Sequence, residues 1–310
     1  MRILFMGTPD FAVSSLKAIV DAGHNICGVI TQPDKPKGRG HKMAHPPVYD
    51  YAESMGFNIY QPISLKDNAI LDILEKENPE LIVVVAYGKI LPEYVLKFPK
   101  YGCVNVHASL LPKYRGAAPI QRCIIDGETV TGVTTMYMEK GLDTGDMISK
   151  TQVDVENDDT FETLHDKLAE AGGKLIVKTI NDIENNNVFA EKQDDSLSTY
   201  AEMISKETAR IDWSKNAKDI YNLVRGLYPA PKAFTFMKDV QIKVTLGKYS
   251  PCESNASYGE IIEVGKEYIR VKCGDNTCFD ISGIQPAGKR EMTVSDYLKG
   301  NTVEKGERFA

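Results

Sequence analysis

The run Leu81-Ile82-Val83-Val84-Val85-Ala86 decides the fold of this 310-residue chain. It is apolar throughout and rich in β-branched residues, a pattern typical of a parallel strand that is covered on both faces. Two further apolar runs, at residues 2–6 and 25–31, flank a helical pattern that Pro9 and Asp10 open. The β-α-β start and the central run predict an α/β fold with a mostly parallel, Rossmann-like sheet.

Strands and helices continue to alternate up to residue 188. A long amphipathic helix at residues 161–183 is expected to be interrupted at Gly172-Gly173, because glycine disfavours helix. Residues 1–188 are therefore predicted to form one domain. Its other elements are predicted as helices at 48–54, 65–77 and 117–125 and as strands at 58–60, 103–107, 130–138 and 147–155.

The sequence pattern changes beyond residue 188. Residues 189–205 are polar without a strong period and are predicted to be a linker. Residues 206–310 carry a short helix at 217–227, followed by five or six β-rich runs separated by Gly, Asn and Ser. Strands at this spacing predict a small β-barrel as a second domain.

The composition is that of an ordinary soluble globular protein, with 42% hydrophobic and 26% charged residues. A formal net charge of -6 argues against a protein that binds nucleic acid over its whole surface. From Lys206 onward, however, 17 basic residues stand against 14 acidic ones. This C-terminal part therefore permits a polyanionic partner without requiring one.

The sequence contains no recognisable signal for export or membrane insertion. A first strand that begins at Arg2 leaves no room for a signal or transit peptide, and no apolar run approaches the roughly 18 residues of a membrane span. The six cysteines form no CxxC pair, and Cys27, Cys103 and Cys123 lie in apolar patterns typical of buried free thiols. We expect a cytoplasmic protein without membrane contact.

Two polar residues, Asn105 and His107, lie at the end of the predicted strand 103–107. They are two positions apart, so they point to the same face, and open α/β sheets bind ligands at the carboxyl ends of their strands. The loops at 87–92 and 139–146 follow other predicted strands, so all three loops are expected to meet at one edge of the sheet. An ordinary strand end and an ordinary turn remain the alternative to a site.

An amide and an imidazole aimed at one oxygen can stabilise an oxyanion, and Asp143 in the third loop can orient or charge the imidazole. No Ser or Cys is placed as a nucleophile, so direct attack by a substrate amine fits better than a covalent acyl-enzyme. We therefore predict acyl or one-carbon transfer. A nicotinamide cofactor is disfavoured, because the turn at residues 7–12 lacks GxGxxG and carries Asp10 where pyrophosphate would lie.

Residues 32–47 form a polar segment with four prolines and two glycines and are predicted to be a long loop. The segment is either a solvated surface loop or a mobile arm that contacts the phosphates of a substrate. His41 and His45 are not expected to bind a metal, because the flanking Pro and Gly residues oppose the helix that would align them. No other metal site is predicted. The basic residues of the segment are Lys35, Lys37, Arg39 and Lys42.

These motifs resemble the 10-formyltetrahydrofolate-dependent formyltransferases. The resemblance rests on Asn105-Val106-His107, on the stretch 109–116 that follows, and on Asp143 in Gly141-Leu142-Asp143-Thr144-Gly145. It extends over RILFMGTPDF at residues 2–11, QPDKPKGRGH at 32–41, the segment 210–213 and the β-rich C-terminal part. Its coverage of the chain makes it more specific than any single motif.

The resemblance implies a formyltransferase domain, an OB-like barrel at residues 206–310, and an enzyme that acts as a monomer. It implies that the formyl group of 10-formyltetrahydrofolate is transferred to the α-amine of methionine on initiator tRNA. Asn105, His107 and Asp143 match the catalytic trio of the family: the amide and the protonated imidazole would stabilise the oxyanion, and the carboxylate would assist proton transfer.

The family also implies where the two substrates bind. Arg39 is the strongest tRNA-reading candidate in the basic loop, followed by Lys37 and Lys42, and the barrel would track the RNA backbone. The loop at 139–143 would help to hold the folate. The folate would otherwise lie against two stretches, namely Ser109, Leu110, Leu111 and Pro112, and Tyr87, Gly88, Ile90 and Leu91.

The sequence leaves two alternatives to formyl transfer onto initiator tRNA. Glycinamide ribonucleotide or a nucleotide-linked amino sugar is an alternative acceptor. Against the ribonucleotide, the turn at residues 7–12 lacks a glycine- and serine-rich phosphate cradle. The basic loop also has no evident use on a small substrate. A nucleic-acid-binding module without activity is the alternative from another class, and it would not need a coupled amide, imidazole and carboxylate.

Overall fold

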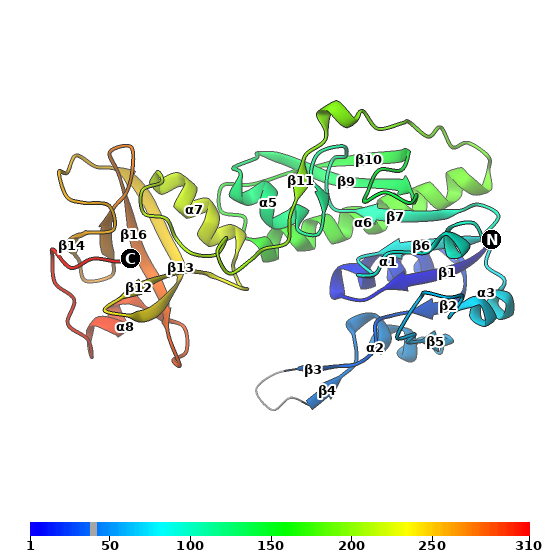
Figure 1. The fold of residues 1–310 in the computed structure, drawn as a ribbon, viewed down its shortest axis with the longest axis horizontal. Helices are drawn as coiled ribbons and strands as arrows, with labels where there is room; N and C mark the ends of the chain where they lie inside the picture. Colours follow the sequence, from blue (N-terminus) through cyan, green and yellow to red (C-terminus); the bar gives the residue numbers. More distant parts are fainter. Residues whose placement is uncertain (38–41) are drawn as a thin grey trace. The chain divides into compact units, whose positions relative to one another are not determined.

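The structure is a computed structural model that describes residues 1–37 and 42–310, and the chain divides into two compact units (Figure 1). The predicted domain boundaries at residues 188 and 205 stay a prediction. The first unit comprises Met1–Pro119, Val130–Asp154 and His165–Ala201, and the second comprises Ile120–Thr129, Val155–Leu164 and Glu202–Ala310.

A seven-stranded sheet forms the centre of the first unit, in the order β10-β9-β7-β6-β1-β2-β5. The strands from β7 to β5 run parallel to their neighbours, whereas β9 is antiparallel to both β7 and β10. The predicted mostly parallel sheet is confirmed. Its strands are β1 (Arg2–Gly7), β2 (Asn25–Ile30), β5 (Ile59–Tyr60), β6 (Leu81–Val85), β7 (Cys103–His107), β9 (Val130–Tyr137) and β10 (Met147–Asp154).

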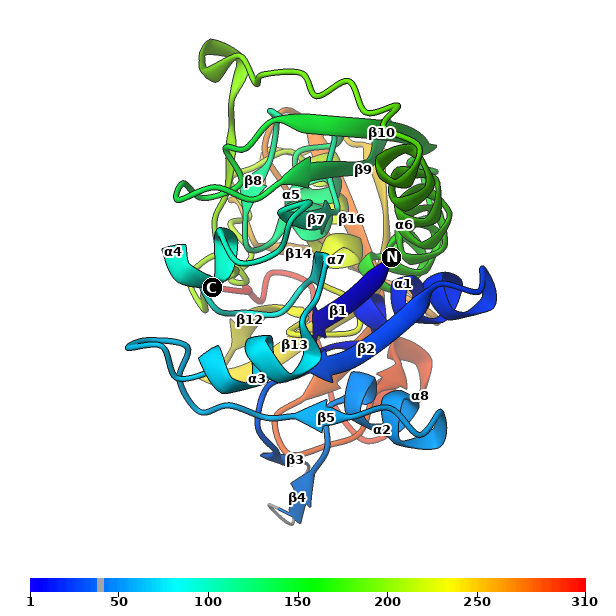
Figure 2. The same cartoon turned by 90° about the vertical axis from the view of Figure 1, so that its right-hand side faces the viewer.

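Helices cover both faces of this sheet (Figure 2). On one face lie α1 (Asp10–Asp21) and α6 (Phe161–Glu184), and on the other lie α3 (Leu71–Glu77) and α4 (Glu93–Leu96). Every residue of β6 is buried as a result, which explains its unbroken apolar sequence. A shorter helix of this unit is α2 (Pro47–Ser54), whereas α5 (Pro119–Ile125) belongs, apart from Pro119, to the second unit.

The predicted interruption of α6 at Gly172-Gly173 is wrong, because the helix is continuous over 24 residues. Both glycines lie where the helix approaches its neighbours closely. A Cβ atom at Gly172 would lie 3.1 Å from Cγ1 of Val106, and one at Gly173 would lie 3.1 Å from the carbonyl oxygen of Ser14. Packing against β7 and α1 therefore outweighs the cost of about 1 kcal/mol for each glycine in a helix.

Two other segments differ from their prediction. The helix expected at residues 65–77 begins only at Leu71, because Asp67 and Asn68 have φ values of 54° and 59°, a left-handed conformation that an α-helix cannot contain. Within residues 32–47, β3 (Lys35–Lys37) and β4 (Lys42–Ala44) pair as an antiparallel hairpin in place of an irregular loop.

Residues 191–201, which lie within the predicted linker, are built into the first unit, and we call them the strap. The backbone of Glu191 pairs with that of Met147 through two hydrogen bonds of 2.8 Å. A 3-10 turn (Asp195–Leu197) follows. The strap ends in β11 (Tyr200–Ala201), which pairs in parallel with β8 (Arg115–Gly116).

The second unit holds an antiparallel sheet in the order β12-β13-β16-β15-β14, with β17 paired to β16. C-terminal residues join its two edges: the backbone of Phe236 pairs with Ala310, and that of Ile261 pairs with residues 306–307. The sheet closes on itself in this way, as a small barrel requires. The elements are α7 (Ala217–Gly226), β12 (Ala233–Met237), β13 (Val240–Pro251), β14 (Ile261–Val264), β15 (Ile269–Lys272), β16 (Thr277–Pro286), β17 (Met292–Thr293) and α8 (Val294–Leu298).

The predicted buried thiols are confirmed, since Cys27, Cys103 and Cys123 are buried and free. Cys252 and Cys278 are joined as a disulfide with Cα atoms 5.6 Å apart, a pairing that the sequence did not predict. Over the described residues, no helix is both long enough and apolar enough to cross a membrane.

Candidate active site

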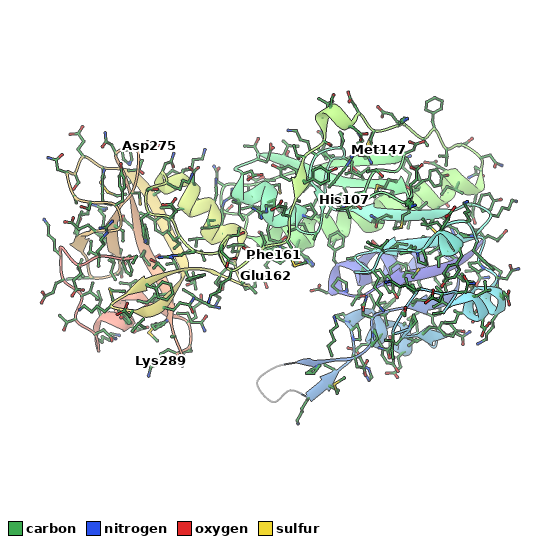
Figure 3. All side chains as sticks on the ribbon, viewed as in Figure 1. His107, Met147, Phe161, Glu162, Asp275 and Lys289 are labelled. Atoms are coloured by element: carbon green, nitrogen blue, oxygen red, sulfur yellow. A yellow bond between two sulfur atoms is a disulfide. The ribbon has the colours of Figure 1, made fainter. Side chains whose placement is uncertain are left out.

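The strand β7 presents Asn105 and His107 on the same face, as predicted. The intervening Val106 points toward α6, where it lies close to Gly172. Cys103 packs with Val95 of α4 on the opposite face, and the alternation of a strand places Asn105 and His107 on the side of Cys103. His107 is labelled in Figure 3. Both residues are buried.

The imidazole of His107 is oriented by two neighbours. Its Nε2 lies 2.8 Å from the carbonyl oxygen of Tyr114, and because a carbonyl can only accept, this nitrogen carries a hydrogen. Its Nδ1 lies 3.6 Å from Oδ2 of Asp143. That distance exceeds a hydrogen bond, so a ligand atom can be engaged by Nδ1 while the carboxylate stabilises positive charge on the ring.

The carboxylate of Asp143 has its own anchor. Its Oδ2 accepts a hydrogen bond of 2.8 Å from the backbone N–H of Gly116. The side chain of Asp143 is 14% exposed and that of His107 is 7% exposed, so the pair is largely screened from bulk water. In the described part of the chain, the Asn105 amide makes no hydrogen bond, which leaves it available to a ligand.

The route by which Asp143 reaches His107 differs from the prediction. The loop at 139–146 does not begin at the predicted edge of the sheet, because β9 is antiparallel and Tyr137 lies opposite Val104 at the start of β7. The loop instead turns back toward His107. Gly145 permits this close approach, since a Cβ atom there would lie 1.8 Å from the carbonyl oxygen of Tyr137.

The loop that follows His107 is held by a buried threonine. Thr134 of β9 lies opposite His107 in the strand register. Its Oγ1 donates to the carbonyl oxygen of Ser109 at 2.7 Å and accepts from the N–H of Leu111 at 3.1 Å. Leu111 packs with Met136 and Met147, and the peptide bond between Leu111 and Pro112 is cis. The predicted folate wall is therefore a fixed loop, and Thr134 was not identified from the sequence.

The second predicted folate stretch divides into buried and accessible residues. Tyr87 and Leu91 belong to the core on the α3 and α4 side of the sheet. Burial raises the pKa of the Tyr87 hydroxyl to about 12. Gly88 is exposed, and Ile90 is 86% exposed. Within this stretch, Gly88 and Ile90 can therefore contact a ligand, whereas the side chains of Tyr87 and Leu91 stabilise the fold.

Comparison with known proteins agrees with the chemistry of these residues. Residues 1–180 match the formyl transferase model, and residues 203–302 match the model of the formyl transferase C-terminal domain. The chain is 48% identical to the methionyl-tRNA formyltransferase of Clostridioides difficile (strain 630), over 99% of both chains. It is 49% identical to that of Alkaliphilus oremlandii (strain OhILAs), over 99% of this chain and 98% of the relative. The chain belongs to the methionyl-tRNA formyltransferases, within the formyl transferase family.

Solved structures of related formyltransferases have the same fold. WlaRD, a sugar 3N-formyl transferase solved with dTDP and 5-N-formyl-THF, has a TM-score of 0.66, a sequence identity of 20%, and coverage of 94% of this chain and 99% of its own. An N-formyltransferase from Helicobacter canadensis has a TM-score of 0.67, also at 20% identity, and coverage of 90% and 98%. At this identity the likeness concerns the fold alone.

The basic hairpin of this formyltransferase is fixed at its base. Nδ1 of His45 lies 2.9 Å from Oδ1 of Asp34, which also accepts from Nε2 of Gln61 at 2.8 Å. The ring of His45 stacks on Tyr49 at 4.1 Å. The hydrogen bond that His45 donates to the Asp34 carboxylate raises the pKa of His45, and the hydrogen bonds that Asp34 accepts from Gln61 and then from His45 lower the pKa of Asp34.

Of the three residues predicted to contact tRNA, the structure describes two. Lys42 lies in β4 and is exposed. Lys37 lies in β3. Arg39 lies outside the described residues. The accessible part of the hairpin thus carries the positive charge that the sequence suggested.

Besides Thr134, two residues that support the site were missed by sequence reasoning. Arg115 is 2% exposed, and its Nη2 donates to Asp195 at 2.7 Å. Gln193 of the strap bonds both to Arg115 and to the backbone of the Asp143 loop. The sequence around Gln193 is polar and aperiodic and carries no signal for such a role.

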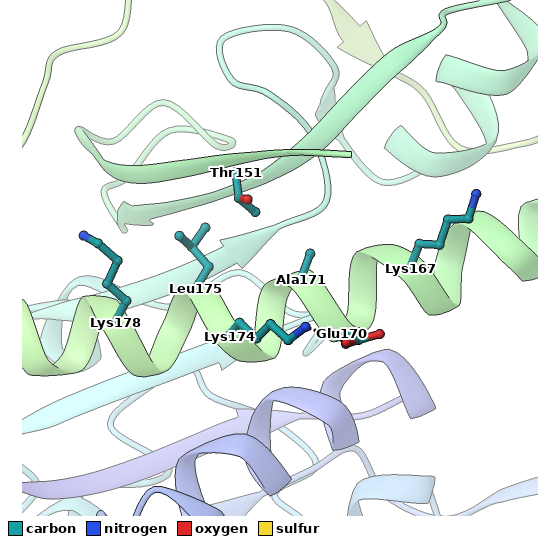
Figure 4. Close-up of a pocket in the computed structure, with 7 residues that line it drawn as sticks. All are labelled: Thr151, Lys167, Glu170, Ala171, Lys174, Leu175 and Lys178. Carbon is teal, nitrogen blue, oxygen red and sulfur yellow. Dashed lines mark hydrogen bonds and ion pairs between the residues drawn. The ribbon is translucent and has the colours of Figure 1, made fainter. Parts of the chain in front are cut away.

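A basic pocket lies elsewhere in the first unit, between α6 and β10 (Figure 4). Its volume is about 460 Å³. Lys174 is paired with Glu170 at 2.6 Å, and Lys178 with Asp182 at 2.7 Å, as on a solvated helix face. Since none of Asn105, His107 and Asp143 lines the pocket, it does not belong to the candidate active site. Its lining residues are Thr151, Lys167, Glu170, Ala171, Lys174, Leu175 and Lys178.

Proposed function

We propose that this enzyme transfers the formyl group of 10-formyltetrahydrofolate to the free α-amino group of methionyl initiator tRNA, giving N-formylmethionyl-tRNA for translation initiation. The observation that carries the proposal is the arrangement of His107, Asp143 and Asn105 at the end of β7. The relatives at 48% and 49% identity, matched over almost their whole length, support the same acceptor.

The reaction joins the methionyl nitrogen to the formyl carbon and breaks the bond from that carbon to N10 of the folate. Attack places negative charge on the formyl oxygen, and donors aimed at this oxygen lower the barrier. The Asn105 amide and Nδ1 of His107, when protonated, are the two donors that this site offers. One donor of this kind typically contributes about 10²–10³ in rate.

Proton movement completes the balance. The α-ammonium first loses one proton to solvent, and the resulting amine attacks. The nitrogen loses a second proton after the attack, and N10 gains one as it leaves. In the proposed mechanism, Asp143 and His107 relay a proton from the nitrogen toward N10. The hydrogen bond from Gly116 and the carbonyl of Tyr114 keep these two groups in position during the transfer.

Substrate choice is assigned to other residues. Lys37 and Lys42 of the hairpin, together with Arg39, would contact the acceptor end of the tRNA, and the C-terminal barrel would follow its backbone. The folate would lie against Ser109, Leu110, Leu111 and Pro112, with Gly88 and Ile90 nearby. Action as a monomer in the cytoplasm is part of the same proposal.

An acceptor competition tests the proposed function. The protein is incubated with 10-formyltetrahydrofolate and an equimolar mixture of methionylated initiator tRNA, glycinamide ribonucleotide and a dTDP-linked amino sugar. We expect formyl-methionyl-tRNA as the dominant product, and none when the folate is omitted. Formylation of the ribonucleotide or of the sugar alone would refute the proposed acceptor. The matched control is His107→Ala, which removes the imidazole and leaves the acceptor-binding surfaces intact.

A further inference from the structure

The strap carries a buried side chain whose amide is fully used inside the protein. Gln193 is 6% exposed although its sequence neighbours are exposed. Its Nε2 donates to the carbonyl oxygens of Asp143 and Gly145, each at 2.8 Å, and its Oε1 accepts from Nε of Arg115 at 3.0 Å. Both N–H donors of the amide and its oxygen therefore have partners.

The residue at the other end of this connection is itself fixed to the strap. The guanidinium of Arg115 donates to Gln193 and to Asp195. The backbone of Arg115 pairs with the strap as well, since its N–H donates to the carbonyl oxygen of Thr199 at 2.9 Å within the pairing of β8 and β11. Arg115 therefore holds its own short segment at a defined place on the strap.

The two neighbours of Arg115 hold the catalytic pair. Tyr114 accepts from Nε2 of His107, and Gly116 donates to the carboxylate of Asp143. Gln193 connects this same segment to the backbone of the Asp143 loop, so one side chain closes a ring of hydrogen bonds around His107 and Asp143.

The Asp143 loop needs such a support. It runs back from the far end of β9, Asp143 takes a left-handed φ of 53°, and Leu142 beside it is exposed. No strand or helix holds residues 138–146. A displacement of about 1 Å in a reacting group can lower a rate about 10²-fold, and the Asp143 carboxylate is 3.6 Å from His107.

We infer that Gln193 is a positioning residue for formyl transfer: its amide fixes the Asp143 loop to the Arg115 segment and thereby sets the carboxylate of Asp143 against His107. The inference rests on the proposed function for the reaction that it serves. The strap, which the sequence predicts to be only a linker, would thus support catalysis.

The test compares Gln193→Glu and Gln193→Met, which keep the shape of the side chain and remove its two N–H donors. The single-turnover rate of formyl transfer at saturating tRNA and folate is expected to fall about 10–100-fold, while KM for each substrate stays within about threefold. Asp194→Ala is the matched control, because the bonds of Asp194 remain within the strap, and its rate should stay within about threefold of wild type. A folded Gln193 variant with the wild-type rate would overturn the inference.

A double-mutant cycle with Asp143→Asn separates positioning from general structural support. If Gln193 acts through Asp143, Gln193→Glu should lower the rate less than about threefold in the Asp143→Asn background. The same fold-loss in both backgrounds would contradict the inference. A wild-type protein that formylates no methionyl-tRNA would refute the proposed function instead.

NMR spectroscopy then tests the role of Gln193 without a measurement of activity, and it needs only one of the two Gln193 variants to fold. The ¹⁵N resonances of the His107 ring are recorded in wild type and in Gln193→Glu or, should that variant not fold, Gln193→Met. A changed Nδ1 resonance is the expected result, and an unchanged one overturns the inference.

Discussion

The hairpin segment at residues 32–47 and the strap at residues 191–201 look alike in sequence, since both are polar and without helical or strand period. In the folded protein they differ. The hairpin turns its accessible side chains outward, with Lys42 exposed and Met43 62% exposed. The strap turns Gln193 inward, to carbonyl oxygens beside Asp143.

The difference teaches that a polar segment can serve an active site in two ways. Exposed cations such as Lys42 contribute binding free energy only when a polyanion binds, and that contribution depends on the salt concentration. A buried amide such as Gln193 is paired in the absence of substrate, so its contribution is already present in the free enzyme. We therefore expect the hairpin to affect tRNA binding and the strap to affect stability and the chemical step.

The largest effect is expected from Arg115→Leu, which removes the anchor of the strap. It leaves the Oε1 of Gln193 without its donor in a buried place, so the free energy of unfolding should fall by about 2–4 kcal/mol. Urea titration followed by circular dichroism measures it. Arg122→Leu is the control, because Arg122 makes one hydrogen bond of 3.2 Å at the surface. Equal destabilisation by the two changes would contradict the role assigned to Arg115.

A smaller effect is expected from the hairpin double variant Lys37→Ala/Lys42→Ala. KM for methionyl-tRNA should rise several-fold with kcat and stability unchanged, and the slope of log KM against log salt should fall by about one per cation removed. Steady-state kinetics at four salt concentrations provide the measurement. Lys174→Ala/Lys178→Ala, in the basic pocket of α6, is the control and should leave KM for methionyl-tRNA unchanged. An equal rise of KM in this control would show that the hairpin has no specific role in tRNA binding.

A local effect is expected at the base of the hairpin. The folded-state pKa of His45 lies above its ordinary value of 6.5. Its pairing with Asp34 therefore stabilises the folded protein fully at pH values below 6.5, and this stabilisation is lost as pH rises through the folded-state pKa. The pKa of Asp34 is lowered, so its contribution is lost as pH falls through the folded pKa. In an NMR titration, Asp34→Asn should lower the pKa of His45. An unchanged titration would show that Asp34 does not hold the hairpin base.

The smallest effect is expected from Tyr87→Phe, which tests whether a buried hydroxyl without a hydrogen bond contributes to stability. The hydroxyl of Tyr87 is buried and has no partner among the described residues, so its removal should leave the free energy of unfolding unchanged or raise it by about 1 kcal/mol. Tyr94→Phe is the control: that hydroxyl donates to Leu65 at 2.8 Å, and its loss should cost about 1 kcal/mol. A larger loss at Tyr87 than at Tyr94 would contradict this account of the core.

Much of the fold followed from local pattern. The apolar run of β6 predicted a doubly covered strand, and the alternation along β7 predicted that Asn105 and His107 share a face. Both signals depend on neighbours along the chain, because side-chain direction repeats every two residues in a strand. The strand direction of β9 has no such signal, so the route of the Asp143 loop could not be predicted.

The support of the site could not be predicted for the same reason. Gln193 bonds to a residue 50 positions earlier and to another 78 positions earlier. A glutamine in a polar segment looks the same whether it is solvated or buried, and the pairings of Glu191 with Met147 and of β11 with β8 bring it to Asp143. Thr134 is hidden in the same way, within a strand rich in threonine and valine.

The central claim is that the chemistry occurs at the end of β7, and His107→Ala tests it most directly. The variant is mixed with saturating 10-formyltetrahydrofolate and methionylated initiator tRNA, and a single turnover is followed by acid quench, with folate binding measured in parallel. The account predicts a rate about 10³-fold below wild type with folate binding within about threefold. A rate within about fivefold of wild type, in a folded variant, would contradict it.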